Sequence, residues 1–199
     1  MLDMDTRFFF LINHGTSNPV FDAVMPFLTN EGYLLVLPYL LFVFYSVLGK
    51  KDASGGSYLV PVVWATAIAF VAFPLAEVIG DGIKDAVIRV RPCHVFEGIR
   101  LLVPCPKSFS MPSGHAVTSF AFATPLFYLT RSLIPLTLRL FPQVLAASIA
   151  FSRVYTGVHY PSDVIAGALL GVGVASLLII IYEWTINTKR GKEELGSKS

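Results

Sequence analysis

The sequence predicts an all-α integral membrane protein, a bundle of helices that crosses the bilayer several times. Hydrophobic residues make up 54% of the 199 residues and charged residues only 14%, with a mean hydropathy of +0.66. Soluble domains average about 25% charged residues. The apolar residues also form long uncharged runs, several of them close to the roughly 20 residues that a transmembrane helix needs. A very apolar soluble protein would not account for runs of this length.

Five such runs predict five transmembrane helices. Turn-forming residues separate them, with glycine and serine in residues 50–56 and Pro135 in a short basic connection. In the last run, Gly167 and Gly171 have the spacing of a face that packs closely against another helix. The predicted spans are Gly32–Gly49, Tyr58–Ile79, Ser113–Thr130, Leu140–Val158 and Asp163–Tyr182.

Two shorter helices are expected before the first span. Phe8–Ile12 is apolar but too short to cross a membrane, and a second helix is expected from Asn18, as its cap, to Leu28. Both fit helices that lie in the membrane interface. If this N-terminal region includes a span, the total is six. With either count, residues 1–188 are expected to form one membrane domain, followed by a polar, disordered tail at 189–199.

The basic residues beside the spans predict the orientation. Lysine and arginine follow the first, third and fifth spans, and an alternating five-span path puts these groups on one side. The positive-inside rule makes that side cytoplasmic, so the C-terminus is expected in the cytoplasm. The polar loop from Asp81 to Ser110 then shares the opposite face with His159. Five basic residues break the rule on that face and need another reason to be there. They are Lys84, Arg89, Arg91, Arg100 and Lys107.

Several partners and cofactors are disfavoured. The net charge is only +2, and no basic arm or interleaving of aromatic with basic residues indicates a nucleic-acid partner. Zinc is not expected, because the chain shows no usual ligand spacing even where His94 follows Cys93. Cys93 and Cys105 lie in the same polar loop. A disulfide is expected if that loop faces an oxidising compartment, and two free thiols are the alternative.

The stretch Pro112-Ser113-Gly114-His115 lies where the polar loop turns into a long apolar run. The first backbone N–H groups of a helix have no partner within the helix, and the helix dipole there favours negative charge. A hydroxyl and an imidazole at this point indicate an anion site. So short a motif recurs by chance, so its meaning depends on what the rest of the chain brings to the same face.

Two further clusters fall on that face. Lys84 and Arg91 are seven residues apart, two turns of a helix, so both point one way if the segment is helical. Arg153 lies inside an apolar run, where an arginine costs roughly 2.5–3.5 kcal/mol and a bound anion would compensate for it. Asp163 follows His159 closely enough to hold its ring. Taken singly, such cations often extend to lipid headgroups, and a lone histidine is more often structural.

Taken together, these groups fit phosphoryl transfer. The phosphoryl group in flight spreads charge over its equatorial oxygens, so it needs several fixed positive donors. Two histidines allow one to attack phosphorus and the other to protonate the leaving oxygen. A carboxylate beside the attacking imidazole fixes its tautomer. No acidic cluster suits magnesium, so a mechanism without a metal is expected.

Three motifs follow one another along the chain: Lys84-x6-Arg91-Pro92, Pro112-Ser113-Gly114-His115 and Ser152-Arg153-x5-His159-x3-Asp163. Together they resemble the tripartite signature of the type 2 phosphatidic acid phosphatase superfamily. That group includes membrane lipid phosphate phosphatases and, more distantly, vanadium-dependent haloperoxidases. The resemblance spans residues 84–163 and implies a helical-bundle core, usually with six spans, and no metal or other cofactor.

The resemblance also implies a role for each motif position. His159 would be the nucleophile that forms a phosphohistidine, and Asp163 would orient it and balance its charge. His115 would be the general acid for the leaving group and then the base that activates water. The positions implied to bind the phosphate are Lys84, Arg91, Ser113, Gly114 and Arg153.

The predicted function is therefore hydrolysis of a lipid phosphate or diphosphate by an enzyme of the cytoplasmic (inner) membrane, with its site on the periplasmic or extracytoplasmic face. Undecaprenyl diphosphate is the first substrate to consider, and phosphatidylglycerophosphate, phosphatidate and the 1-phosphate of lipid A are the others. A lipid phosphotransferase that uses the same phosphohistidine is an alternative. A non-catalytic lipid-binding protein is another, although the intact histidines argue against it.

Overall fold

The structure is a computed structural model, and it describes residues 3–51 and 55–196. Within these ranges every extended regular element is a helix, which confirms the all-α prediction. Residues 52–54 of the predicted turn at 50–56 lie outside the described ranges. The elements are α1 (Met4–Asn13), α2 (Pro19–Glu31), the 3-10 helix η1 (Gly32–Leu35), α3 (Val36–Val47), α4 (Leu59–Val87), α5 (Pro92–Val95), α6 (Gly114–Leu129), α7 (Leu136–Tyr155) and α8 (Pro161–Gly196).

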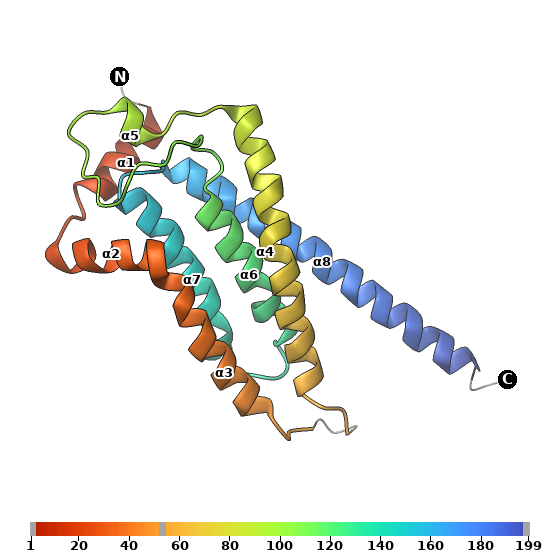
Figure 1. Cartoon of the computed structure of the whole chain (residues 1–199). Helices are drawn as coiled ribbons and strands as arrows, with labels where there is room; N and C mark the ends of the chain where they lie inside the picture. The colour runs from red at the N-terminus through yellow and green to blue at the C-terminus, as the bar shows by residue number, and fades with distance from the viewer. Residues whose placement is uncertain (1–2, 52–54, 197–199) are drawn as a thin grey trace.

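Helix α6 is the centre of the bundle, and α4, α7 and α8 all pack against it. Figure 1 shows α6 enclosed by these helices, with α1, α5 and the long loop before α6 gathered at one end. Small side chains let the helices approach closely: Ala72 and Ala76 of α4 meet Val117 and Ala121 of α6, and Ala175 of α8 joins them. This packing brings the ends of four helices to the same end of the molecule.

Two glycines of α8 make its contact with α6 possible. A Cβ atom on Gly171 would lie 2.2 Å from the carbonyl oxygen of Val117, and one on Gly167 would lie 2.6 Å from that of Ser113. Both distances are far below van der Waals contact, and the neighbour is backbone in each case. The predicted close-packing face is confirmed, and it lies against the start of α6.

Replacing Gly171 by alanine should lower the melting temperature of the purified protein in detergent by several degrees. The added methyl group forces two backbones apart, which typically costs about 1–3 kcal/mol, and 1 kcal/mol shifts the melting temperature of a chain this long by about 2–4 °C. Gly173 is the matched control, because a Cβ there meets nothing within 4 Å. A Gly171→Ala protein as stable as Gly173→Ala would show that the packing is not tight.

Three of the described helical stretches are long and apolar enough to cross a membrane: Pro19–Val47, Leu59–Val95 and Pro161–Thr188. Their outward apolar side chains, such as Val78 at 71% exposure and Ile180 at 62%, are those of an integral membrane protein. Helix α6 has only 16 residues, fewer than the roughly 20 of a typical span. The count of five or six spans therefore stays a prediction.

The two ends of the chain differ from expectation in different ways. Helix α2 continues through η1 into α3, and Figure 1 shows α2 lying across the bundle while α3 runs along it. At the other end, α8 extends to Gly196, so the expectation of disorder from Lys189 is wrong as far as the structure describes the tail; residues 197–199 lie beyond it. Lysine, arginine and glutamate favour helix, which explains the continuation.

Candidate active site

The three motifs meet at the end of the bundle where α7 ends and α6 and α8 begin (Figure 1). Most of their polar side chains are removed from solvent, with Arg91, Arg153 and His159 at 4%, 5% and 1% exposure and Asp163 at 0%. Burying this many polar and charged groups costs free energy unless they pair with one another or with a ligand.

His159 is held from both sides of its ring. Nη1 of Arg91 lies 2.7 Å from Nε2, and Nδ1 lies 3.4 Å from Oδ2 of Asp163. A guanidinium can only donate, so Nε2 must accept and the ring proton must be on Nδ1, facing the carboxylate. Burial lowers the pKa of His159 to about 3, although its hydrogen bond with Asp163 opposes the shift. The imidazole is therefore neutral at pH 7, and the lone pair of its Nε2 accepts from Arg91.

Asp163 lies in the first turn of α8 and accepts several hydrogen bonds. The Ser110 hydroxyl donates to Oδ2 at 2.5 Å, and the Tyr160 N–H donates to the same oxygen at 2.9 Å. Nη1 of Arg89 donates to Oδ1 at 2.6 Å. Sequence reasoning assigned no role to Ser110 or Arg89. Arg89 did give a signal, as one of the cations that break the positive-inside rule, whereas a serine in a polar loop gives none.

Arg91 is fixed by the loop that precedes α6. Its Nε donates to the carbonyl of Ser108 at 2.7 Å, and its Nη2 donates to the hydroxyl of Ser108 at 3.0 Å and to the carbonyl of Phe109 at 3.1 Å. Its Nη1 also donates to the carbonyl of Val158 at 3.1 Å. The guanidinium is thus held in one orientation against the His159 ring.

The single helix on which Lys84 and Arg91 would point the same way does not form. Helix α4 ends at Val87, and Ile88 adopts a left-handed conformation with φ 53°. Arg91 is then extended, with ψ 151°, as expected for a residue before proline. Lys84 nevertheless reaches the site from the last turn of α4. Its Nζ lies beside Gly114, only 3.2 Å from where a Cβ atom on that glycine would be. That ammonium also pairs with Asp81 at 2.6 Å.

The start of α6 leaves polar groups free. Ser113 is the N-cap residue, but its hydroxyl makes no capping hydrogen bond. Among the described residues, three buried side-chain atoms have no hydrogen-bond partner: Ser113 Oγ and Arg153 Nε at this site, and Arg139 Nε near the other end of α7. Buried polar atoms almost always have a partner, so two such atoms at one site indicate a place for a ligand. With Lys84 and a helix N-terminus beside them, the ligand that fits is an anion.

The end of α2 also reaches the site. Nη1 of Arg153 donates to the hydroxyl of Thr29 at 2.5 Å, and Nε2 of His115 lies 3.1 Å from the carbonyl oxygen of Thr29. A carbonyl only accepts, so Nε2 of His115 carries a proton. His115 is exposed whereas His159 is buried, so the site opens on the His115 side. Thr29 has no signal in the sequence, since it lies 86 residues from His115.

Cys93 and Cys105 are paired in the loop. Their sulfur atoms are bonded, and their Cα atoms are 6.1 Å apart, within the usual range for a disulfide. Together with His94 they form the one group of described residues close enough to share a metal ion. A bonded sulfur is not the thiolate that a metal needs, so the geometry assigns this pair to a disulfide. The bond closes residues 93–105, and Ser108, the partner of Arg91, follows shortly after Cys105.

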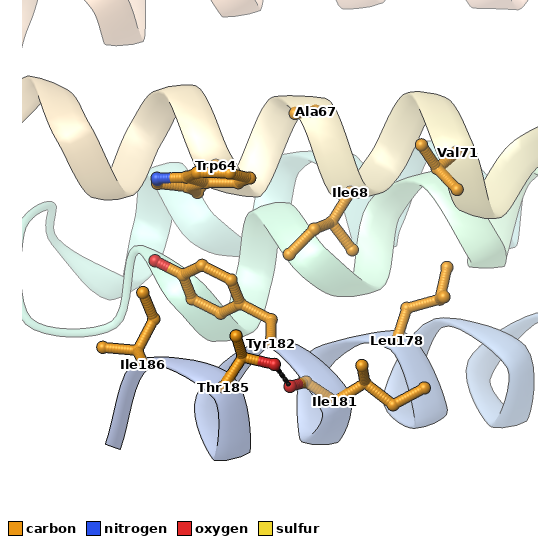
Figure 2. A pocket seen from close by; sticks show the side chains of 9 residues that line it. All are labelled: Trp64, Ala67, Ile68, Val71, Leu178, Ile181, Tyr182, Thr185 and Ile186. Atoms are coloured by element: carbon orange, nitrogen blue, oxygen red, sulfur yellow. Dashed lines mark hydrogen bonds between the residues drawn. The ribbon is translucent and has the colours of Figure 1, made fainter. Parts of the chain in front are cut away.

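A separate groove lies between α4 and α8 and takes no part in the site. Figure 2 shows its lining, in which Trp64 of α4 faces Tyr182 of α8, with ring centroids 5.4 Å apart. The remaining lining side chains are apolar except Thr185, whose hydroxyl donates to the carbonyl of Ile181 at 2.8 Å. No group there suits phosphoryl chemistry, and the exposed apolar walls suit contact with lipid.

Comparison with known proteins supports the assignment of the fold. A solved structure of a PAP2-type phosphatidylglycerolphosphate phosphatase from Bacillus subtilis superposes with a TM-score of 0.64 at 23% identity, covering 90% of this chain and 84% of that one. The chain is also 35% identical over 111 residues to an undecaprenyl-diphosphatase of Sulfolobus acidocaldarius, covering 56% of this chain and 52% of the relative.

A decaprenylphosphoryl-5-phosphoribose phosphatase of Mycobacterium tuberculosis is 40% identical over 114 residues, covering 57% of each chain. The alignment thus spans little more than half the length of either relative. The family model of the PAP2 superfamily matches residues 58–187, which include all three motifs and the helices that carry them. On this match and this geometry, the chain belongs to the PAP2 superfamily.

Proposed function

We propose that this protein is a membrane phosphatase that hydrolyses a lipid phosphate or diphosphate through a phosphohistidine on His159. The observation that carries the proposal is the state of the His159 ring. Its proton is on Nδ1 toward Asp163, and the lone pair of its Nε2 points toward a guanidinium. A neutral imidazole with a carboxylate behind it and a cation in front suits attack on a phosphoryl group.

In the first step, Nε2 of His159 attacks phosphorus and the bond from phosphorus to the lipid or phosphate oxygen breaks. His115, as the imidazolium, protonates that leaving oxygen and becomes the neutral imidazole. Nη1 of Arg91 must pass from Nε2 to a phosphoryl oxygen, because both cannot occupy the same space. Asp163 balances the positive charge that develops on the His159 ring.

In the second step, a water molecule attacks phosphorus and the phosphorus–nitrogen bond breaks. His115, now deprotonated, accepts the proton of that water, and inorganic phosphate leaves. Throughout, the phosphoryl oxygens have donors on several sides: Lys84, Arg91, the Ser113 hydroxyl, the Gly114 N–H and Arg153. No step needs a metal ion, so we propose a metal-independent reaction.

For the substrate we propose a polyprenyl diphosphate, with undecaprenyl diphosphate first. The Sulfolobus relative is named for that substrate, and the mycobacterial relative for a polyprenyl-linked phosphate. Apolar outer faces on α4 and α8 would let the lipid chain stay in the bilayer while its phosphate enters the site. A phosphotransferase would use the same groups and differ only in the acceptor of the second step.

The proposal is tested by phosphate release from four lipids in detergent, with and without EDTA. The lipids are undecaprenyl diphosphate, phosphatidylglycerophosphate, phosphatidate and lipid A 1-phosphate. We expect release from at least the first, unchanged by EDTA. Release that requires an added acceptor lipid would favour the phosphotransferase. No release from any of the four, with a folded protein, would contradict a phosphatase of this substrate class.

A further inference from the structure

We propose that Arg89 is a positioning residue for this reaction, which holds the carboxylate of Asp163 while Asp5 of helix α1 holds Arg89 in turn. The inference rests on the proposed function, because it concerns the carboxylate that orients His159. It extends the site to two residues outside the three motifs, one of them in the N-terminal helix.

The Arg89 guanidinium binds two carboxylates at once. Its Nη1 lies 2.6 Å from Oδ1 of Asp163, and its Nη2 lies 2.5 Å from Oδ2 of Asp5. The plane of the group also lies over the ring of Tyr160, with Cζ 4.1 Å from the centroid. A planar fork with five donors can make these contacts together, and a lysine ammonium cannot. Arg89 therefore fixes the direction of the Asp163 carboxylate, not only its charge.

The contact with Arg89 gives the two oxygens of Asp163 different partners. Oδ1 is taken by Arg89, so Oδ2 is the oxygen left to face Nδ1 of His159 at 3.4 Å. Asp163 is fully buried, where an ionised carboxylate needs a cation or several donors to remain charged. Arg91 donates to Ser108 and to the His159 ring, and Arg153 donates to Thr29, so among the described residues Arg89 is the cation bonded to this carboxylate.

Asp5 makes the arrangement rigid. Its Oδ1 accepts the Ser162 N–H at 3.0 Å, in the first turn of α8, and its Oδ2 accepts the Ser162 hydroxyl at 2.5 Å. Nη1 of Arg89 in turn donates to that hydroxyl at 2.6 Å. The carboxylate of α1 thus serves as a cap for α8 from outside the helix, where such N–H groups lack partners. Helix α1 and the start of α8 are joined through the same groups that hold Asp163.

A second ion pair offers a matched control. Nη2 of Arg100 binds both oxygens of Asp22, at 2.5 and 2.6 Å, and its Nη1 donates to the carbonyl of Asn13 at 2.9 Å. This pair also fastens the N-terminal helices to the long loop, and the Arg100 side chain is 24% exposed against 26% for Arg89. It makes no hydrogen bond or ion pair with His159 or Asp163, so it reports the effect of loosening the N-terminal region alone.

The test compares Arg89→Ala with Arg100→Ala, using the lipid that the wild-type protein hydrolyses best. We expect Arg89→Ala to lower kcat about 10- to 100-fold, the range in which outer partners of functional side chains act, with KM changed less. Millimolar guanidinium should restore part of the kcat of Arg89→Ala, since the site is partly open, and should not raise that of Arg100→Ala. Arg89→Lys and Asp5→Asn should show smaller losses, because each keeps part of the network.

Several results would overturn the proposal. They are an Arg89→Ala protein with the kcat of wild type, an equal loss in Arg100→Ala, and a guanidinium effect that is the same in both. If Arg89→Ala does not purify as a folded protein, the comparison is made with Arg89→Lys. A wild-type protein inactive on every lipid overturns the proposed function and this inference with it. An active wild type with an unaffected Arg89 variant overturns this inference alone.

Discussion

Replacing His159 by alanine is expected to abolish phosphate release, with kcat lowered by a factor on the order of 10⁴ to 10⁶, as when the nucleophile of a catalytic triad is removed. The reason is geometric. The Nε2 of His159 is the described imidazole nitrogen whose lone pair accepts from Arg91, and no other group of the site can take its place once that guanidinium moves to the phosphate. Lipid binding should persist, because the groups proposed to hold the phosphate remain.

The measurement is a rapid-quench experiment with lipid labelled on the terminal phosphoryl group, the one that is transferred to His159 and then released as inorganic phosphate. Wild type should carry label on the protein that is lost in acid and kept in base, as a phosphorus–nitrogen bond requires. His159→Ala should carry none. His14→Ala is the control, since His14 lies exposed at the end of α1 and contacts Phe10. Full activity in His159→Ala would remove the phosphohistidine from the mechanism.

Changing Asp163 to asparagine should lower kcat by about 10⁴, with a much smaller change in KM. An asparagine can present its NH₂ group to Nδ1 of His159, which then accepts, so that the proton moves to Nε2. The attacking lone pair is lost, although the side chain keeps its size. The carboxylate contacts with Ser110 and Arg89 are weakened by the same change.

Steady-state kinetics on the preferred lipid measure this effect, with the melting temperature as a check on folding. Asp22→Asn makes the same change in the ion pair with Arg100, away from His159. It should keep kcat within a few-fold of wild type. If Asp163→Asn turned over like Asp22→Asn, Asp163 would have no part in catalysis and its burial would be structural.

The sequence by itself determined the class of the fold and the residues of the three motifs. Apolar runs of membrane length have few physical solutions, because backbone groups in lipid must be satisfied within a helix. The spacing of Gly167 and Gly171 likewise predicted a close helix contact. The absence of a side chain at a glycine can be read from the sequence without knowing its neighbours. The motif residues could be found because each motif contains charged or polar residues that are uncommon in an apolar chain, at short and fixed spacings along the sequence.

Tertiary structure alone decided how those residues are held. Helix α4 ends before Arg91, because Ile88 adopts a left-handed conformation. Nothing in the sequence around Ile88 indicates a helix end at that residue. Thr29 reaches His115 and Arg153, and Asp5 reaches Arg89, across 84 or more residues of sequence. Such contacts depend on how α1 and α2 fold back over the helix ends. The chemistry of a side chain can be read locally, but its partner is chosen by the packing of the whole chain.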